Sequence, residues 1–170
     1  GAVNVANQPP VAKCKNVTVS VGANCTATAS INDGSFDPDA ADTITVTQNP
    51  AGPYSVGQTT VTLIVTDNRG ASSTCSAIVT VDDNTAPGIT VPAAITQSTD
   101  AGLCEAMVAV GTATATDNCS ATVTGVRSDS LPLNAAYPKG VTTITWTATD
   151  AAGNSATGTQ TITVNDTEAP

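Results

Sequence analysis

An internal repeat is the feature that most constrains how this 170-residue chain can fold. The run VTLIVTD, which ends at Asp67, is followed by a Gly-containing turn and the run SSTCSAIVTV. The run ITWTATD, which ends at Asp150, is followed by a second Gly-containing turn and the run SATGTQTITV. The two aspartates lie 150 − 67 = 83 residues apart. A fixed period of this kind predicts two successive copies of one fold, which we place at residues 1–84 and 85–170.

Within each repeat, apolar residues alternate with Thr and Ser. Val17 and Val19 flank a threonine in the first repeat, and Ile144 and Trp146 do so in the second. This period of two predicts antiparallel strands with one buried and one solvated face, and it places Trp146 in a core. No segment carries a helical apolar stripe. We therefore expect an all-β fold of two tandem immunoglobulin-like β-sandwich domains, each with six or seven strands.

Composition excludes several classes of function. The formal net charge is −9, histidine is absent, and only five residues are Lys or Arg. A chain without histidine lacks a Ser-His-Asp triad and an imidazole zinc site. Dispersed basic residues argue against nucleic-acid binding, and short apolar runs argue against membrane insertion. A glycosidase with paired carboxylates would need aromatic sugar platforms, which the chain lacks, so we do not expect an enzyme.

Disulfides are expected because small cores with few aromatic residues are marginally stable. Cys14 opens the first strand of repeat one and Cys75 opens its last strand, and these ends lie together in an immunoglobulin-like sandwich. The corresponding positions of repeat two, Val91 and Gly158, both lack cysteine. This paired absence predicts a Cys14–Cys75 bond.

Three further cysteines leave the second pairing open. Cys104 and Cys119 both lie in repeat two, and we expect them to bond to each other. A strand between them would separate them widely, so the alternative is a bond from Cys119 to Cys25 across the domain junction. In the preferred scheme Cys25 is unpaired, or bonded to another chain.

Acidic residues gather in the loops that meet at one pole of each predicted sandwich. Oxygen ligands converging from several loops suit Ca²⁺, which takes six to eight oxygens. The alternative is that Asp and Asn are ordinary turn residues in contact with solvent. The recurrence of the pattern in both repeats favours calcium. The predicted ligands are Asp37, Asp39 and Asp67 in repeat one, with Asn7 and Asp42 as additional candidates, and Asp82, Asp83, Asn84, Asp117 and Asp150 in repeat two.

Several motifs resemble those of a known family. The runs TDNCS (residues 116–120), TATDAAGNSAT (147–157) and NDTEAP (165–170) are similar to the hyalin repeat, or HYR, module. The run GSFDPDAADTITV (34–46) resembles the related PKD and cadherin-like modules, whose DPD loop is associated with calcium. The resemblance implies tandem extracellular domains at the cell surface that serve adhesion rather than catalysis.

Together these features predict a calcium-stiffened extracellular rod of two modules. The closing run NDTEAP repeats the linker, so we expect either a piece of a longer array or a subunit that stacks end to end. In the second case Asp166 and Glu168 would enter the acidic pole of the next chain, and residues 1–6 would add to a neighbour's sheet edge, giving a head-to-tail filament. Expected partners are copies of the chain, neighbouring modules, or a cell-surface or matrix protein or glycan. The alternative function is a ligand- or glycan-binding accessory module of a larger secreted protein.

Overall fold

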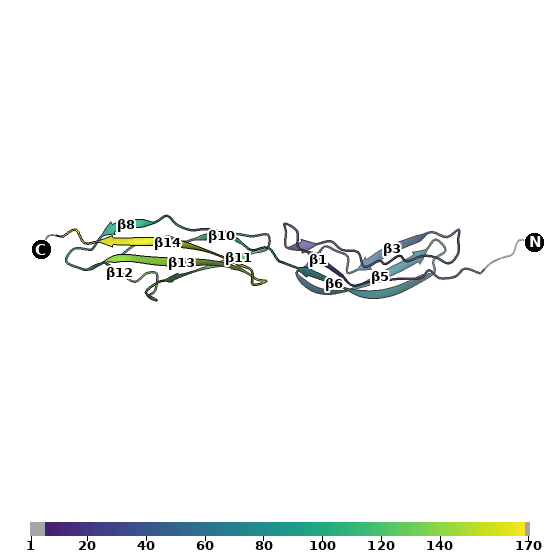
Figure 1. Cartoon of the computed structure of the whole chain (residues 1–170). Helices are drawn as coiled ribbons and strands as arrows, with labels where there is room; N and C mark the ends of the chain where they lie inside the picture. Colours follow the sequence, from purple (N-terminus) through teal and green to yellow (C-terminus); the bar gives the residue numbers. More distant parts are fainter. Residues whose placement is uncertain (1–5, 169–170) are drawn as a thin grey trace, which may run out of the picture. The chain divides into compact units, whose positions relative to one another are not determined.

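The structure, a computed structural model, describes residues 6–168. Its internal contacts divide the chain into unit 1, Gly1–Asp83, and unit 2, Asn84–Pro170. The sequence placed this division one residue later. The described residues form strands, turns and loops without any helix, so the predicted all-β class is confirmed (Figure 1). The segment expected to add to a neighbouring sheet lies outside the described residues, apart from Ala6.

Unit 1 is built around a four-stranded sheet in the order β1-β6-β5-β3 (Figure 1). The first and last strands, β1 and β6, run parallel, and the other pairs are antiparallel. A two-stranded sheet of β2 and β4, with bridges at Val11–Phe36 and Cys14–Asn32, completes the unit. The strands are β1 (Val17–Ser20), β2 (Thr26–Ala27), β3 (Ile44–Asn49), β4 (Tyr54–Ser55), β5 (Gly57–Asp67) and β6 (Ser72–Asp82).

Unit 2 repeats this plan with a four-stranded sheet in the order β11-β13-β14-β8. Here β8 runs parallel to the last strand, β14. Two small sheets, β10-β7 and β12-β9, complete the unit. The strands are β7 (Gly88–Thr90), β8 (Ile95–Ser98), β9 (Glu105–Ala106), β10 (Thr114–Thr116), β11 (Ala121–Arg127), β12 (Tyr137–Pro138), β13 (Gly140–Asp150) and β14 (Ser155–Asn165).

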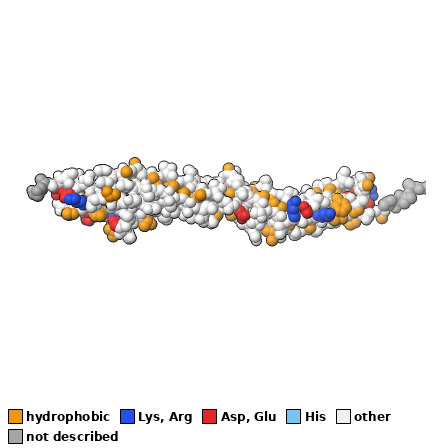
Figure 2. Space-filling view, in the orientation of Figure 1, with side chains coloured by type: hydrophobic (Ala, Val, Ile, Leu, Met, Phe, Trp, Pro, Cys, Tyr) orange, Lys and Arg blue, Asp and Glu red, His pale blue; other side chains and the backbone are white. Residues whose placement is uncertain are grey.

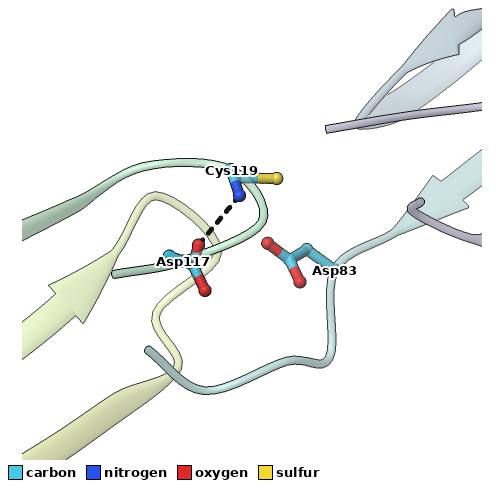
Figure 3. Close-up of side chains that lie close together, drawn as sticks. All are labelled: Asp83, Asp117 and Cys119. Carbon is cyan, nitrogen blue, oxygen red and sulfur yellow. Dashed lines mark hydrogen bonds between the residues drawn. The ribbon is translucent and has the colours of Figure 1, made fainter. Parts of the chain in front are cut away.

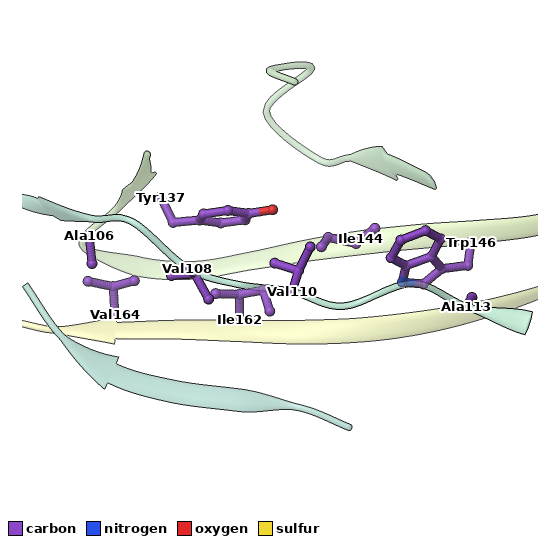
Figure 4. Packing of buried hydrophobic residues seen from close by; sticks show 9 residues of the cluster. All are labelled: Ala106, Val108, Val110, Ala113, Tyr137, Ile144, Trp146, Ile162 and Val164. Atoms are coloured by element: carbon purple, nitrogen blue, oxygen red, sulfur yellow. The ribbon is translucent and has the colours of Figure 1, made fainter. Parts of the chain in front are cut away.

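The predicted alternation decides which side chains are buried. In β5 the residues Val61, Leu63 and Val65 have no exposed surface, while Thr62 and Ile64 between them are partly exposed. In unit 2, Trp146 is 3% exposed and packs with Ile144 as predicted (Figure 4). Its indole Nε1–H donates to Gln160 Oε1 at 3.1 Å. This bond satisfies the polar edge of a buried ring.

The two units are fastened differently at equivalent positions. In unit 1, Cys14 and Cys75 form a disulfide with Cα atoms 6.0 Å apart, as predicted. In unit 2 the corresponding residues are Val91 and Gly158. A Cβ placed on Gly158 would lie 2.6 Å from Val91 Cγ1, a distance that real side chains do not adopt. The valine therefore fills the space that the missing side chain leaves, and packing replaces the covalent bond.

Arg127, at the end of β11, organises the long loop between β11 and β12. Its side chain is fully buried and donates to Asp129 and to the carbonyl oxygens of Pro132, Ala135 and Ala136. The guanidinium also lies 3.7 Å from the centre of the Tyr137 ring. Each charged or polar atom of this arginine thus has a structural role, so we do not assign it to a binding site.

Candidate metal-binding site

Asp67 forms the centre of the turn between β5 and β6. Its Oδ1 accepts hydrogen bonds from the backbone N–H groups of Arg69 and Ala71, at 2.8 and 2.9 Å. Its Oδ2 accepts one from Asn7 Nδ2 at 2.8 Å, although Asn7 is 60 residues away in the sequence. The bond from Asn7 lowers the pKa of Asp67 below its usual value, against the burial that raises it, and the turn amides lower it further. Asp67 is therefore held ionised.

Asp37 and Asp42 join Asp67 in a cluster that lies entirely within unit 1. One carboxylate oxygen from each of the three residues lies within 4.8 Å of the others. The Asp42 side chain is only 1% exposed. Asp37 Oδ2 and Asp42 Oδ2 are buried and have no hydrogen-bond partner among residues 6–168. Buried carboxylate oxygens without partners are costly unless a cation or donor reaches them, so this aspartate cluster is suited to a hard cation.

The loop before β3 carries Asp37, Asp39 and Asp42, but only Asp37 and Asp42 join the aspartate cluster. Asp39, a predicted ligand, lies outside the cluster and accepts hydrogen bonds from the backbone and side-chain nitrogens of Gln8 at 2.9 and 3.3 Å. Asp42, only an additional candidate in the sequence, is the buried member. The sequence run DPDAAD shows that three aspartates are present, but it does not show which way their side chains point. The one available signal was Arg69 in the facing turn, because Arg69 Nη2 contacts Asp42 Oδ1 at 3.1 Å.

Asp150 occupies the equivalent turn of unit 2, between β13 and β14. Its two oxygens accept from the backbone and the side chain of Asn154, both at 2.8 Å. Burial raises the pKa of Asp150, but the hydrogen bonds from Asn154 and from the backbone N–H groups of Gly153 and Ala152 together outweigh it, so the pKa lies below its usual value. Asn154 therefore supplies from within the turn the bond that Asn7 supplies to Asp67 from a distant segment.

The predicted donors at the C-terminal side of unit 2 are bonded to their own unit. Asp166 Oδ2 accepts from Lys139 Nζ at 3.1 Å, and this contact lowers the pKa of Asp166. Both Glu168 carboxylate oxygens accept from the backbone N–H of Gly102 at 3.1 Å. These contacts are exposed, so each contributes little to stability.

The cysteines require one correction to the sequence prediction. Cys104 is a free, exposed thiol, so the predicted Cys104–Cys119 bond is wrong. Cys25 and Cys119 are each disulfide-bonded, so the expectation of an unpaired Cys25 is also wrong. The sequence signalled the difficulty, since a strand between Cys104 and Cys119 would separate them, and the structure places both β9 and β10 there.

The aromatic residues do not form a binding surface within the described residues. Tyr54, Tyr137 and Trp146 are at most 3% exposed, and Phe36, at 44%, lies beneath the Lys13 ammonium. On the face shown in Figure 2, the few charged side chains form small groups in which red and blue lie next to each other, with no extended basic patch. Neither arrangement resembles a sugar platform or a basic groove.

Comparison with known proteins identifies the repeat. A family model described as the HYR domain matches residues 5–81 and again residues 82–164. The chain belongs to the HYR family. The resemblance noted from the motifs of the two repeats is thereby confirmed, since the same family model matches each of them.

A curated relative supports the same assignment. Hyalin from Strongylocentrotus purpuratus is 34% identical over 165 residues, which cover 92% of this chain and 14% of hyalin. The chain thus spans about one seventh of the length of that relative. Crystal structures of Drosophila N-cadherin EC1-4 and human Protocadherin-24 EC1-2 are 14% and 15% identical, with TM-scores of 0.46 and 0.38. They cover 94% and 97% of this chain, and 50% and 100% of their own. These TM-scores are too low to carry a conclusion about function.

Family membership settles the broad character of the protein. The two HYR domains are extracellular, and the Cys14–Cys75 disulfide fits that compartment. They are modules of the non-catalytic, adhesion type. None of the described residues forms a helix long and apolar enough to cross a membrane.

The second HYR domain, whose match begins at residue 82, holds its own group of potential ligands. Asp83, Asp117 and Cys119 each present one ligand atom, and these atoms lie within 4.8 Å of one another (Figure 3). The Cys119 N–H donates to Asp117 Oδ2 at 3.1 Å. The sulfur of Cys119 is part of a disulfide and offers no thiolate, so the two carboxylates are the chemically relevant ligands of this group.

Three other predicted ligands lie apart from both groups. Asp82 ends β6, with its backbone oxygen bonded to the Val21 N–H at 3.0 Å. Asn84 is exposed in the linker, and Asp150 is held by Asn154. Of the predicted ligands, the structure thus brings Asp37 near Asp67, and Asp83 near Asp117.

Proposed function

We propose that this chain is a pair of adhesive HYR domains whose N-terminal poles bind Ca²⁺. The observation that carries the proposal is the aspartate cluster of unit 1, in which Asp37 Oδ2 and Asp42 Oδ2 are buried without partners among the described residues. Three carboxylates within 4.8 Å of one another repel unless a cation lies among them. The donors are hard oxygens without imidazole, the set that Ca²⁺ prefers over zinc or copper.

The site would also fasten the segment that enters unit 1. Asn7 and Gln8 already donate to Asp67 and Asp39, so this segment is attached to the loops that supply the ligands. A bound ion would hold those loops in one arrangement. In the second HYR domain, Asp83 belongs to the linker, so an ion held there with Asp117 would restrain the linker. Calcium bound at these two positions would stiffen the pair of domains.

The test is a calcium titration of the full chain followed by NMR. The Ala71 backbone N–H donates to Asp67 and reports on the site of unit 1, while the Cys119 N–H donates to Asp117 and reports on the second site. We expect the Ala71 resonance to shift with a Kd of about 10⁻⁴–10⁻³ M, the range of extracellular modules. D42N should abolish this shift. D33N, which removes the same charge from an exposed ion pair with Lys15, is the matched control and should leave it unchanged.

Stiffening has its own measurement. Small-angle X-ray scattering of the wild-type chain, with calcium and then with a chelator, should show a narrower distribution of interatomic distances when calcium is bound. If calcium shifts the Ala71 amide resonance but leaves the scattering unchanged, the ion binds at the pole without stiffening the chain. If calcium shifts no resonance at either pole, the proposal is refuted.

End-to-end assembly extends the proposal to self-association. Asp166 and Glu168 would have to leave Lys139 and Gly102 to enter a neighbouring pole, and both contacts are exposed enough to exchange at little cost. Electron microscopy of the purified chain with and without calcium tests this step. Isolated particles under both conditions would refute the filament and leave the calcium sites standing.

A further inference from the structure

The aspartate cluster of unit 1 contains a cation of its own, and this inference rests on the calcium site proposed above. Arg69, in the turn between β5 and β6, places Nη2 at 3.1 Å from Asp42 Oδ1. The Arg69 side chain is 46% exposed, whereas the Asp42 side chain is 1% exposed. A half-exposed guanidinium thus neutralises one oxygen of a buried carboxylate, while the Oδ2 atom of the same carboxylate has no partner among residues 6–168.

We propose that Arg69 is the residue that sets the calcium affinity of unit 1, by acting as a built-in competing cation. An ion held by Asp37, Asp42 and Asp67 would lie close to the guanidinium. Arginine remains charged at all physiological pH values, so protonation cannot remove this competition. Calcium must either displace Arg69 from Asp42 or bind against its repulsion, and both lower the affinity.

The same contact keeps the pole ordered without metal. Arg69 offsets one of the three negative charges, and the turn amides and Asn7 bind Asp67. Because a surface guanidinium can turn toward solvent at little cost, the arginine can yield when calcium arrives. Unit 1 would therefore fold without calcium and respond to its concentration.

Unit 2 provides a natural comparison for this role. The turn Asn68-Arg69-Gly70 of unit 1 corresponds to Ala151-Ala152-Gly153 of unit 2, so alanine stands where Arg69 stands in unit 1. Asp150 is bonded by Asn154 of its own turn and faces no arginine from that position. The two repeats thus differ at the residue that would compete with the ion.

The experiment measures calcium affinity at unit 1 in the full chain, through the Ala71 amide resonance. R69Q removes the cation and should bind calcium roughly five- to tenfold more tightly than the wild-type chain, as expected for a unit charge about 5 Å from a divalent ion under partial screening. R69K keeps the charge and should stay within about twofold of wild type. K15Q removes an equal charge from the exposed ion pair between Lys15 and Asp33, so it should also leave the affinity unchanged.

The outcomes separate this inference from the proposal on which it rests. If the wild-type chain binds calcium and R69Q binds equally or more weakly, Arg69 is not a competitor, and the calcium site stands. If neither protein binds, both ideas are overturned. Binding by R69Q alone supports the competing role of Arg69 and refutes calcium binding by the wild-type unit. If R69Q and K15Q increase the calcium affinity equally, the increase would reflect the change in net charge alone, and the inference would be overturned.

Discussion

The double substitution V91C/G158C should give unit 2 the disulfide that unit 1 already has. A Cβ built on Gly158 lies 3.8 Å from Val91 Cβ, which is the mean Cβ–Cβ distance of a disulfide. The same Cβ collides with Val91 Cγ1 at 2.6 Å, and replacing valine by cysteine puts a single sulfur in place of the two γ-methyl groups. The geometry therefore favours the bond only when both residues change.

The expected gain follows from loop closure. The bond would join residues 158 − 91 = 67 positions apart, against a separation of 61 for Cys14 and Cys75. A loop of that length corresponds to roughly 4 kcal/mol in the chain-entropy treatment, and the lost valine methyl costs about 1 kcal/mol. A net gain of about 3 kcal/mol corresponds to an increase of about 1–3 M in the urea midpoint.

Trp146 makes the measurement specific to unit 2, since it is the one tryptophan of the chain and lies in the core of this unit. Urea unfolding followed by tryptophan fluorescence should be performed in a C104S background, which removes the free thiol. G158A alone is the control and should destabilise unit 2 by about 1–3 kcal/mol through the collision with Val91. Two reactive thiols in the folded double variant, or an oxidised variant with an unchanged midpoint, would refute the assigned equivalence.

Three further predictions concern stability and covalent structure. R127M should destabilise unit 2 by about 3–5 kcal/mol in the same assay, because it leaves Asp129 and three loop carbonyl oxygens without their donor; a loss below 1 kcal/mol would contradict the organising role of Arg127. The hydrogen bond from Arg127 lowers the pKa of Asp129, so its stabilising contribution is complete above the unfolded pKa of about 3.9 and is lost as the pH falls through the lower folded value. The urea midpoint of unit 2 should therefore fall as the pH is lowered below about 4, and less steeply in D129N. Peptide mapping without reduction should recover a Cys14–Cys75 cross-link and an alkylated Cys104, and it also tests the alternative pairing of Cys25 with Cys119 raised from the sequence.

The fold followed from the sequence because its signals are periodic. Alternation fixed the buried face of each long strand, including the inward side of Trp146, since a slip of one residue would expose every apolar side chain. The comparison of repeats also found Cys14–Cys75, because Cys75 and Gly158 lie in the equivalent strands β6 and β14, and Cys14 and Val91 lie shortly before β1 and β8.

The details of the site did not follow, because loop carboxylates carry no periodicity. Asp39 and Asp42 are equally acidic in the sequence, and their roles differ only because Gln8 meets one while Arg69 meets the other. Both contacts join segments far apart in the chain. The bond from Asn7 to Asp67 likewise spans 60 residues, and no local pattern announces it.

The parallel pairing of strands near the two ends of each HYR domain has a mechanical consequence. In unit 1, β1 pairs with β6 from Val17–Val79 to Ser20–Asp82, and in unit 2, β8 pairs with β14 in the same sense. When a chain is pulled from both ends, such strands are drawn past each other along their length. The hydrogen bonds between them are then loaded together rather than opened one at a time. Each HYR domain thus has a short pair of parallel strands between its ends that is loaded in shear when the chain is pulled. This is the arrangement of strands that best resists tension.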